Sequence, residues 1–311
     1  MLIFGPVPSR RLGRSLGINN IPFKACSYSC VYCQVGPTGT TEFVPRVFYT
    51  PDQIYEEVLE HIERIQKKGE QIDYLSFVPD GEPTLDSMLS ETIERLRPVG
   101  IPIAVLSNAS LIWREEVRET LMQADWVSLK VDAIEEDPWR RVNRPHQSLD
   151  HQAILDGMLA FAGDFKGTLA TESMLLRGLN DSDRAASQLA DFLGKLKPNK
   201  AYLSIPTRPP AEKGVHAPNE AILNRIYQMI SQQVSHLELI TEYEGNTFAS
   251  TGDVAEDLLS ITSVHPMRDE AVQELLTKTG TDWHLVEQLI EDRRLMQTEY
   301  EGRKFYIRRI Q

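Results

Sequence analysis

The stretch A-C-S-Y-S-C-V-Y-C-Q, residues 25–34, contains every cysteine of this 311-residue chain, spaced Cys26-x3-Cys30-x2-Cys33. A tetrahedral zinc site needs four ligands, usually as two close pairs, and no second pair follows here. A redox-active C-x-x-C motif would use Cys30 and Cys33 and would leave Cys26 without a role. An iron–sulfur cluster of four irons held by three thiolates accounts for all three cysteines and leaves one iron open to a ligand that is not protein.

The composition is that of an ordinary globular protein, with 41% hydrophobic and 25% charged residues. No apolar run reaches the ~18 residues of a membrane span, and the amino terminus lacks a signal-peptide pattern, so we expect a cytoplasmic protein with no membrane partner. Three clustered cysteines argue against a disulfide framework. The formal net charge of −12 disfavours broad attraction to phosphate polymers but leaves room for a local basic patch.

Between residues 15 and 240 the chain alternates between strand-like and helix-like patterns. We expect strands at 15–19, 74–78, 101–106, 126–131, 167–175, 201–205 and 237–240, and helices at 51–69, 84–96, 113–123, 151–161, 181–196 and 220–234. This alternation predicts a parallel α/β sheet, because a parallel return needs a crossover helix. About six such units fit an incomplete barrel or a doubly wound sheet, and the pattern alone does not decide between them.

The pattern changes after a polar, glycine-containing stretch at residues 241–253, which we interpret as a linker. It would separate a core domain, residues 1–245, from a small domain, residues 254–311. In the small domain we expect helices at 254–260, 269–277 and 282–295, then a β-hairpin at 296–299 and 304–310. Three helices followed by a hairpin are typical of a winged-helix domain.

The residues of this small domain leave its partner open between RNA and protein. The third helix would expose His284, Glu287, Gln288 and Glu291, and its two carboxylates would repel phosphates. The hairpin, in contrast, carries Arg303, Lys304, Arg308 and Arg309, which could contact a nucleic-acid backbone. We therefore expect residues 254–311 to dock an RNA or protein substrate, with protein slightly favoured.

The cysteine motif, with Tyr32 just before the third cysteine and a strand just before the loop, resembles that of the radical S-adenosylmethionine (SAM) superfamily. The resemblance implies a partial (β/α)6 TIM-like barrel and a [4Fe–4S] cluster on Cys26, Cys30 and Cys33. The open iron would chelate the amino and carboxylate groups of SAM, with Tyr32 nearby. An external donor of the flavodoxin or ferredoxin type would supply one electron, and SAM would break to a 5′-deoxyadenosyl radical.

Further motifs follow the expected strands, where sites of parallel α/β sheets gather. Pro79-Asp80-Gly81-Glu82-Pro83 resembles the family's glycine-rich segment at the SAM ammonium, which implies contacts from Gly81, Glu82 and Pro83, although Asp80 replaces the first glycine. Ser107-Asn108 resembles a Thr-Asn-Gly segment near SAM. Considered alone, these residues would be a turn and a helix cap.

The later strands carry the remaining predicted SAM contacts. Ser128-Leu129-Lys130 resembles an Asp-x-Lys segment whose lysine meets the SAM carboxylate, with Ser128 in place of the aspartate. A buried lysine needs a partner, and Asp132, on the same strand face, is the alternative to a bound carboxylate. The resemblance also implies Glu172 at the SAM ribose and Ser204 near the adenine.

Two arginine-bearing stretches, 139–146 and 207–213, are interpreted as substrate loops for carboxylate or phosphate groups, with solvated surface loops as the alternative. The amino-terminal stretch 9–14 is similar and could equally pair with the excess acid of the chain.

The order of motifs over residues 1–240 resembles wyosine-synthase-like iron–sulfur oxidoreductases. No further cysteine is present for a second cluster, and Lys24, the lysine nearest the motif, has no assigned role. The expected function is that of a radical SAM enzyme that abstracts hydrogen from an unidentified substrate, with RNA (tRNA modification) and peptide or protein as candidates. The alternatives are a winged-helix regulator with an iron–sulfur redox sensor, which would not need Gly81-Glu82 or Lys130 at strand ends, and a zinc-binding scaffold.

Overall fold

The computed structural model describes residues 2–241, 248, 250, 252–264 and 266–309. An eight-stranded sheet dominates the fold, with its strands ordered as they occur in the chain. The strands are β1 (Ile3–Ser9), β2 (Gly13–Ile18), β3 (Tyr74–Phe77), β4 (Ile103–Ser107), β5 (Trp126–Lys130), β6 (Thr168–Met174), β7 (Lys200–Ser204) and β8 (Leu237–Ile240). Strands β2 to β8 are parallel, and β1 is antiparallel to β2.

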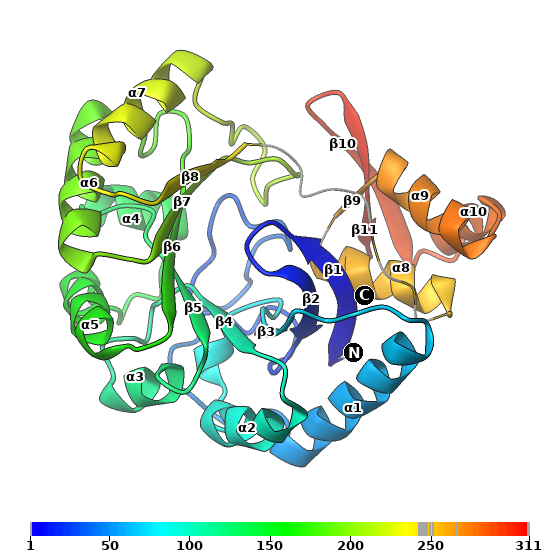
Figure 1. The fold of residues 1–311 in the computed structure, drawn as a ribbon. Helices are drawn as coiled ribbons and strands as arrows, with labels where there is room; N and C mark the ends of the chain where they lie inside the picture. The colour runs from blue at the N-terminus through cyan, green and yellow to red at the C-terminus, as the bar shows by residue number, and fades with distance from the viewer. Residues whose placement is uncertain (1, 242–247, 249, 251, 265, 310–311) are drawn as a thin grey trace.

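The strand order decides between the two architectures left open above. A doubly wound sheet reverses its strand order at a switch point, whereas this order runs from β1 to β8 without a reversal. The sheet is strongly curved, and helices cover its outer face (Figure 1). This arrangement is consistent with an incomplete barrel, in which the carboxyl ends of the strands share one rim.

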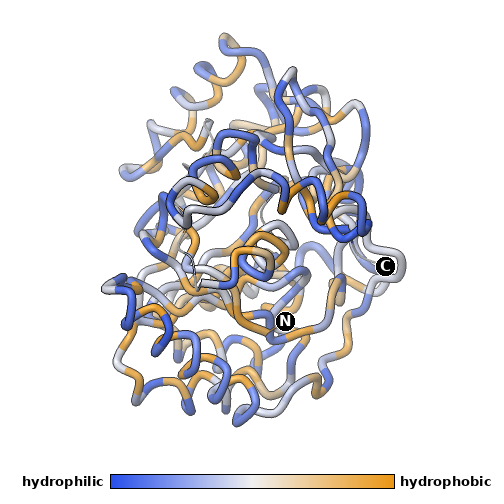
Figure 2. Tube along the Cα trace, turned by 90° about the vertical axis from the view of Figure 1, so that its right-hand side faces the viewer, coloured by the Kyte–Doolittle hydropathy of each residue, from blue (hydrophilic) through white to orange (hydrophobic). Residues whose placement is uncertain are grey.

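Helices connect the parallel strands. They are α1 (Pro51–Lys67), α2 (Leu89–Leu96), α3 (Glu115–Leu121), α4 (Glu136–Asn143), α5 (His151–Asp164), α6 (Asp183–Leu196) and α7 (Glu220–Ser231). In α1, the side chain of Thr50 accepts a hydrogen bond from Gln53 N, the side chain of Gln53 bonds back to the backbone of Thr50, and Pro51 occupies the first turn. Hydrophobic and hydrophilic residues alternate along the outer helices (Figure 2), as helices packed on a sheet require.

Three elements differ from the sequence-based expectations. Strand β1 was not among the expected strands. It contains Pro6 and Pro8, which are tolerated because β1 lies at the sheet edge. Residues 139–146 are not a loop, because α4 covers most of them. The helix expected at 84–96 begins only at Leu89, after a separate 3-10 turn at Pro83–Leu85.

The carboxyl-terminal residues form a second sheet with strand order β10-β11-β9. Its elements are α8 (Val254–Val264), β9 (Met267–Arg268), α9 (Asp269–Thr279), α10 (His284–Glu291), β10 (Leu295–Tyr300) and β11 (Arg303–Arg308). Helix α8 packs against β1, and Phe4 and Val7 share a core cluster with Leu258 and Phe305. Most of the expected linker, residues 241–253, and the expected strand end at Ile310 lie outside the described residues.

The large core cluster lies between the eight-stranded sheet and its helices. Among the described residues, no helix combines the length and apolar character that a bilayer crossing demands.

Candidate active site

A cavity of about 320 Å³ lies at the rim formed by the carboxyl ends of the strands. It brings together most of the residues singled out from the sequence: its lining includes Cys26, Cys30, Tyr32, Cys33, Gly81, Ser107, Asn108, Ser128, Lys130 and Glu172. Its volume is in the range of small-ligand sites. A cavity of about 400 Å³ beside the β1–β2 hairpin and Lys278 is lined by none of these residues.

The cysteine loop is pinned to the loop that follows β3. Lys24 N donates to Asp80 O at 3.1 Å, and Glu82 N donates to Ala25 O at 3.0 Å. Gly81 packs so closely that a Cβ at this position would lie 2.0 Å from Ala25 O. Only glycine permits this approach, so the glycine-rich segment fixes where the first cysteine lies.

Each of the three cysteine sulfurs receives a hydrogen bond from a side-chain nitrogen. Asn108 Nδ2 lies 3.6 Å from Cys26 Sγ, Asn143 Nδ2 lies 3.4 Å from Cys30 Sγ, and Lys24 Nζ lies 3.3 Å from Cys33 Sγ. The sequence analysis gave no role to Lys24 and placed Asn143 in a substrate loop. The three donors come from three separate segments of the chain, so local spacing could not reveal them.

The environment of the thiols suits a metal cluster better than free thiol chemistry. Burial raises the pKa of Cys26 to about 12 and raises the pKa of Cys30 even further, so neither is a reactive thiolate near neutral pH by itself. A bound metal centre supplies the positive charge that deprotonates such thiols. Within the described part of the chain, no three His, Cys, Asp or Glu side chains converge to hold one metal ion. A [4Fe–4S] cluster binds each thiolate through a different iron, so three separate thiols at one cavity fit a cluster.

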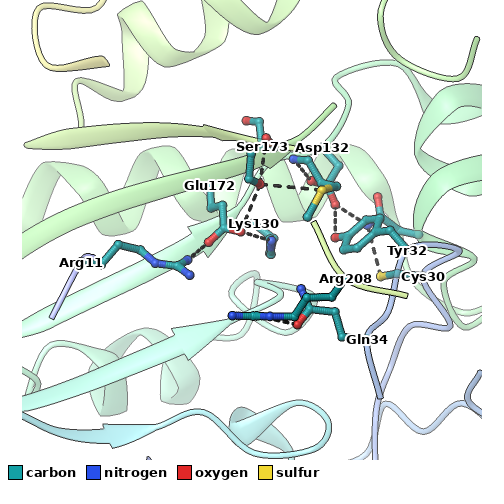
Figure 3. Close-up of polar contacts among 12 residues, drawn as sticks. Arg11, Cys30, Tyr32, Gln34, Lys130, Asp132, Glu172, Ser173 and Arg208 are labelled. Carbon is teal, nitrogen blue, oxygen red and sulfur yellow. Dashed lines mark hydrogen bonds and ion pairs between the residues drawn. The ribbon is translucent and has the colours of Figure 1, made fainter. Parts of the chain in front are cut away.

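Lys130 and Glu172 form the charged centre of the cavity wall, where Nζ lies 2.7 Å from Oε1 (Figure 3). Arg11, from the β1–β2 turn, also binds this carboxylate through Oε2, and Ser204 Oγ donates to Oε1 at 3.2 Å. Burial lowers the pKa of Lys130. The sequence analysis offered Asp132 or a bound carboxylate as the partner of Lys130. The structure has Glu172 in place of Asp132, and a bound carboxylate stays a prediction.

Asp132 instead anchors neighbouring groups of the site. Its Oδ2 accepts hydrogen bonds from Tyr32 Oη at 2.5 Å and Asn143 Nδ2 at 2.6 Å, and its Oδ1 accepts one from Met174 N at 2.8 Å. Asp132 lies two residues beyond the end of β5, so the alternation of strand faces no longer applies to it. Its carboxylate therefore fixes the orientation of Tyr32 beside the cysteines.

Three of the predicted SAM contacts, Glu82, Pro83 and Ser204, lie behind the cavity wall. The carboxylate of Glu82 is fully buried and accepts hydrogen bonds from Thr84 N, Thr84 Oγ1, Ser107 Oγ and Asn108 N. These bonds counteract the rise in the pKa of Glu82 that burial causes. Glu82 thus holds the loop after β4 in place, and its contact with a ligand stays a prediction.

Asp80, which replaces the first glycine of the family segment, also lines the cavity. The residue is 8% exposed, and its Oδ1 has no hydrogen-bond partner among the described residues. Burial raises its pKa to about 7. A buried carboxyl oxygen without a partner is costly, so this position favours a ligand that donates a hydrogen bond, or a protonated carboxyl.

The two arginine-bearing stretches have different positions. Arg208 lines the cavity and donates Nη1 to Gln34 Oε1 at 2.8 Å (Figure 3). The three arginines of 139–146 do not line it: Arg140 pairs with Glu136, Arg141 donates to Gly178 O, and Arg144 pairs with Glu212. A substrate contact by the arginines of this stretch stays a prediction.

The model of the radical SAM superfamily matches residues 20–189, which include the cysteine motif, the segment after β3 and the Lys130–Glu172 pair. The match covers more than half of the chain, so the chain belongs to the radical SAM superfamily, as its motifs predicted. Members of this superfamily are enzymes that use a [4Fe–4S] cluster and SAM.

Within the superfamily, the chain is 46% identical over 311 residues to a UPF0026 protein of Methanocaldococcus jannaschii. The matched region covers 99% of this chain and 96% of that protein. A solved structure of TYW1 with a lysine–pyruvate adduct bound covers 71% of this chain and 74% of that one, with a TM-score of 0.56 and 18% identity. Streptococcus suis SuiB bound to S-adenosylmethionine covers 72% and 49%, with a TM-score of 0.51 and 15% identity. At such identities the two structures show a shared fold.

Proposed function

We propose that Cys26, Cys30 and Cys33 hold the [4Fe–4S] cluster and that SAM binds beside it in the 320 Å³ cavity. The observation that supports this most strongly is that all three thiols line one cavity, each with a nitrogen donor at its sulfur. When bound, the cluster supplies the electron that converts SAM to a hydrogen-abstracting radical. The protein itself orients the ligands and excludes water.

The charged residues of the wall have distinct proposed tasks. Lys130 has three N–H donors and directs one at Glu172, so it is placed to share another with the carboxylate of SAM. Glu172, held by Lys130, Arg11 and Ser204, is the proposed acceptor for ribose hydroxyls. Tyr32, fixed by Asp132, covers the cysteine side of the cavity.

We propose that residues 1–245 form the catalytic domain and that residues 254–311 form a winged-helix module that docks the substrate. The observed order of helix, strand, helix, helix, strand and strand supports this assignment. The exposed Arg303 and Lys304 on the β10–β11 hairpin favour an RNA substrate, because cations there would contact phosphates. The exposed Glu287 and Glu291 on α10 favour a peptide or protein substrate instead.

Anaerobic reconstitution tests the enzymatic proposal. The protein is loaded with iron and sulfide, and SAM and dithionite, which stands in for the natural electron donor, are then added. We expect four irons per chain and release of 5′-deoxyadenosine, with both lost in Cys33→Ala. A cluster that changes with redox state but releases no 5′-deoxyadenosine would support the sensor alternative. A colourless protein with one zinc would support the scaffold.

Retention of RNA tests the docking proposal. The full chain is purified, and RNA that co-purifies is measured before and after nuclease treatment. We expect Arg303→Glu with Lys304→Glu to reduce the retained RNA several-fold, and Lys166→Glu with Lys195→Glu, exposed on the barrel, to leave it unchanged. Equal loss in both variants would indicate only general attraction to cations, and absence of RNA in the unaltered protein would favour a peptide substrate.

A further inference from the structure

The three nitrogen donors at the cysteine sulfurs are each held in place by a second interaction. Asn108 Nδ2 also donates to Ser27 Oγ at 2.9 Å, while Asn108 Oδ1 accepts from Ser110 N at 2.9 Å. The amide of Asn108 is therefore fixed at both ends, and its N–H groups must point toward the cysteine loop.

Asn143 lies at the end of α4 and is only 2% exposed. Its Nδ2 donates both to Asp132 Oδ2 at 2.6 Å and to Cys30 Sγ at 3.4 Å. A carboxylate accepts hydrogen bonds only, when ionised, so Asp132 determines which end of the amide faces the sulfur.

Lys24 is the charged member of the set. Its Nζ donates to Gly36 O at 2.5 Å and to Cys33 Sγ at 3.3 Å, and its backbone adopts φ 61°. This left-handed conformation is unusual for lysine, and the Lys24 N bond to Asp80 O keeps it in place. The loop geometry thus directs a cation at one particular sulfur of the three.

We propose that Lys24, Asn108 and Asn143 set the reduction potential of the cluster by donating hydrogen bonds to its three thiolates. Hydrogen bonds to the sulfurs are among the factors that set the potentials of iron–sulfur clusters. Reduction adds negative charge that spreads onto the thiolates, so donors stabilise the reduced form and raise the potential. Lys24 adds a full positive charge and therefore has the largest effect, at the Cys33 corner. These residues are positioning residues. The inference rests on the proposed cluster ligands.

The test is a redox titration of the reconstituted full-length protein, with the reduced cluster followed by electron paramagnetic resonance. The variants are Lys24→Met, Lys24→Gln and Asn143→Ala. The controls, Lys166→Met and Asn224→Ala, change the same residue types at exposed positions of the barrel. Iron content and Tm are measured for every variant, so that loss of the cluster or of the fold is recognised separately.

We expect Lys24→Met to lower the equilibrium constant for reduction of the cluster about tenfold. For a one-electron couple, this corresponds to a reduction potential that is lower by about 59 mV. Lys24→Gln can keep an N–H donor but lacks the charge, so it should lower this equilibrium constant less. Asn143→Ala should lower the equilibrium constant several-fold. Potentials equal to those of the controls, at four irons per chain, would overturn the inference while leaving the cluster assignment intact. If Lys24→Met loses its cluster, the potential of Lys24→Gln is compared with those of the controls in the same way. Failure of the unaltered protein to bind four irons would instead overturn the proposed cluster ligands.

Discussion

Lys130 and Glu172 are register partners on the neighbouring parallel strands β5 and β6, and their side chains meet at 2.7 Å in the cavity wall. The two side chains are 26% and 9% exposed, so the pair is largely shielded from solvent. Arg11 joins them from the far end of the sheet. Opposite charges in such a place are interdependent, because removing one leaves the others uncompensated.

Glu172→Gln is therefore expected to lower the free energy of unfolding of the apoprotein by about 3 kcal/mol at pH 7, because it leaves two cations near a neutral amide. Urea denaturation under anaerobic, reducing conditions measures this change. Adding Lys130→Met should restore part of the loss. Glu238→Gln, whose exposed carboxylate lies 3.8 Å from Lys200, should change the value by less than about 1 kcal/mol. A Glu172→Gln protein as stable as this control would contradict the prediction.

The carboxyl group of Asp80 is expected to make the stability of the folded protein depend on pH. Its folded-state pKa of about 7 lies above the ordinary value of 3.8, so the folded protein holds this proton more tightly than the unfolded chain does. Protonated Asp80 therefore contributes to the free energy of unfolding at low pH. This contribution, on the order of 4 kcal/mol in total, is lost as the pH rises to about 7.

Asp80→Asn removes this dependence on pH. The variant should therefore exceed the unaltered apoprotein in stability by more at pH 8 than at pH 5. Thermal unfolding at both pH values measures the difference. Asp164→Asn, at an exposed position, serves as the control and should show no such change. Parallel pH profiles for the Asp80→Asn and unaltered proteins would refute the expectation.

Gly81→Ala should displace the cysteine loop, because the new Cβ would lie 2.0 Å from Ala25 O and 2.8 Å from Ala25 C, both backbone atoms. We expect a loss of about 1–3 kcal/mol in stability and a fall in bound iron after reconstitution. Gly39→Ala is the matched control, since no heavy atom lies within 4 Å of a Cβ there. Full iron content in Gly81→Ala would show that the loop tolerates the shift.

Tyr32→Phe removes the hydroxyl that donates to Asp132 at 2.5 Å inside the protein. Asp132 keeps its bonds from Asn143 and Met174, so we expect a modest loss of about 1–2 kcal/mol. Calorimetry of the apoprotein measures it, with Tyr49→Phe, outside the cavity lining, for comparison. Equal effects in the two variants would mean that the Asp132 contact adds nothing.

The fold was predictable where a strand is a short apolar run bounded by loops. The run from Leu237 to Ile240 was located without error, and Trp126 to Lys130 within one residue. Strand β1 was missed because Pro6 and Pro8 argue against a strand unless its edge position is already known. Helix α4 was missed because its polar sequence buries few side chains, Trp139 and Val142 among them.

The site was predictable to the extent that its residues stand at the ends of strands. The cysteines and the predicted residues at the ends of β3, β4 and β5 lie at the cavity or directly behind it. The partner of Lys130 was not predictable, because Glu172 is 42 positions away and only the sheet register brings it close. The roles of Lys24 and Asn143 likewise depend on contacts between loops, which no periodic pattern encodes.

Phe4 and Val7 of β1 line the cavity and also belong to the carboxyl-terminal core cluster. The apolar side chains of β1 therefore depend on the carboxyl-terminal elements for part of their cover. A chain truncated before α8 would expose the side chains of Phe4 and Val7 at the edge of the cavity.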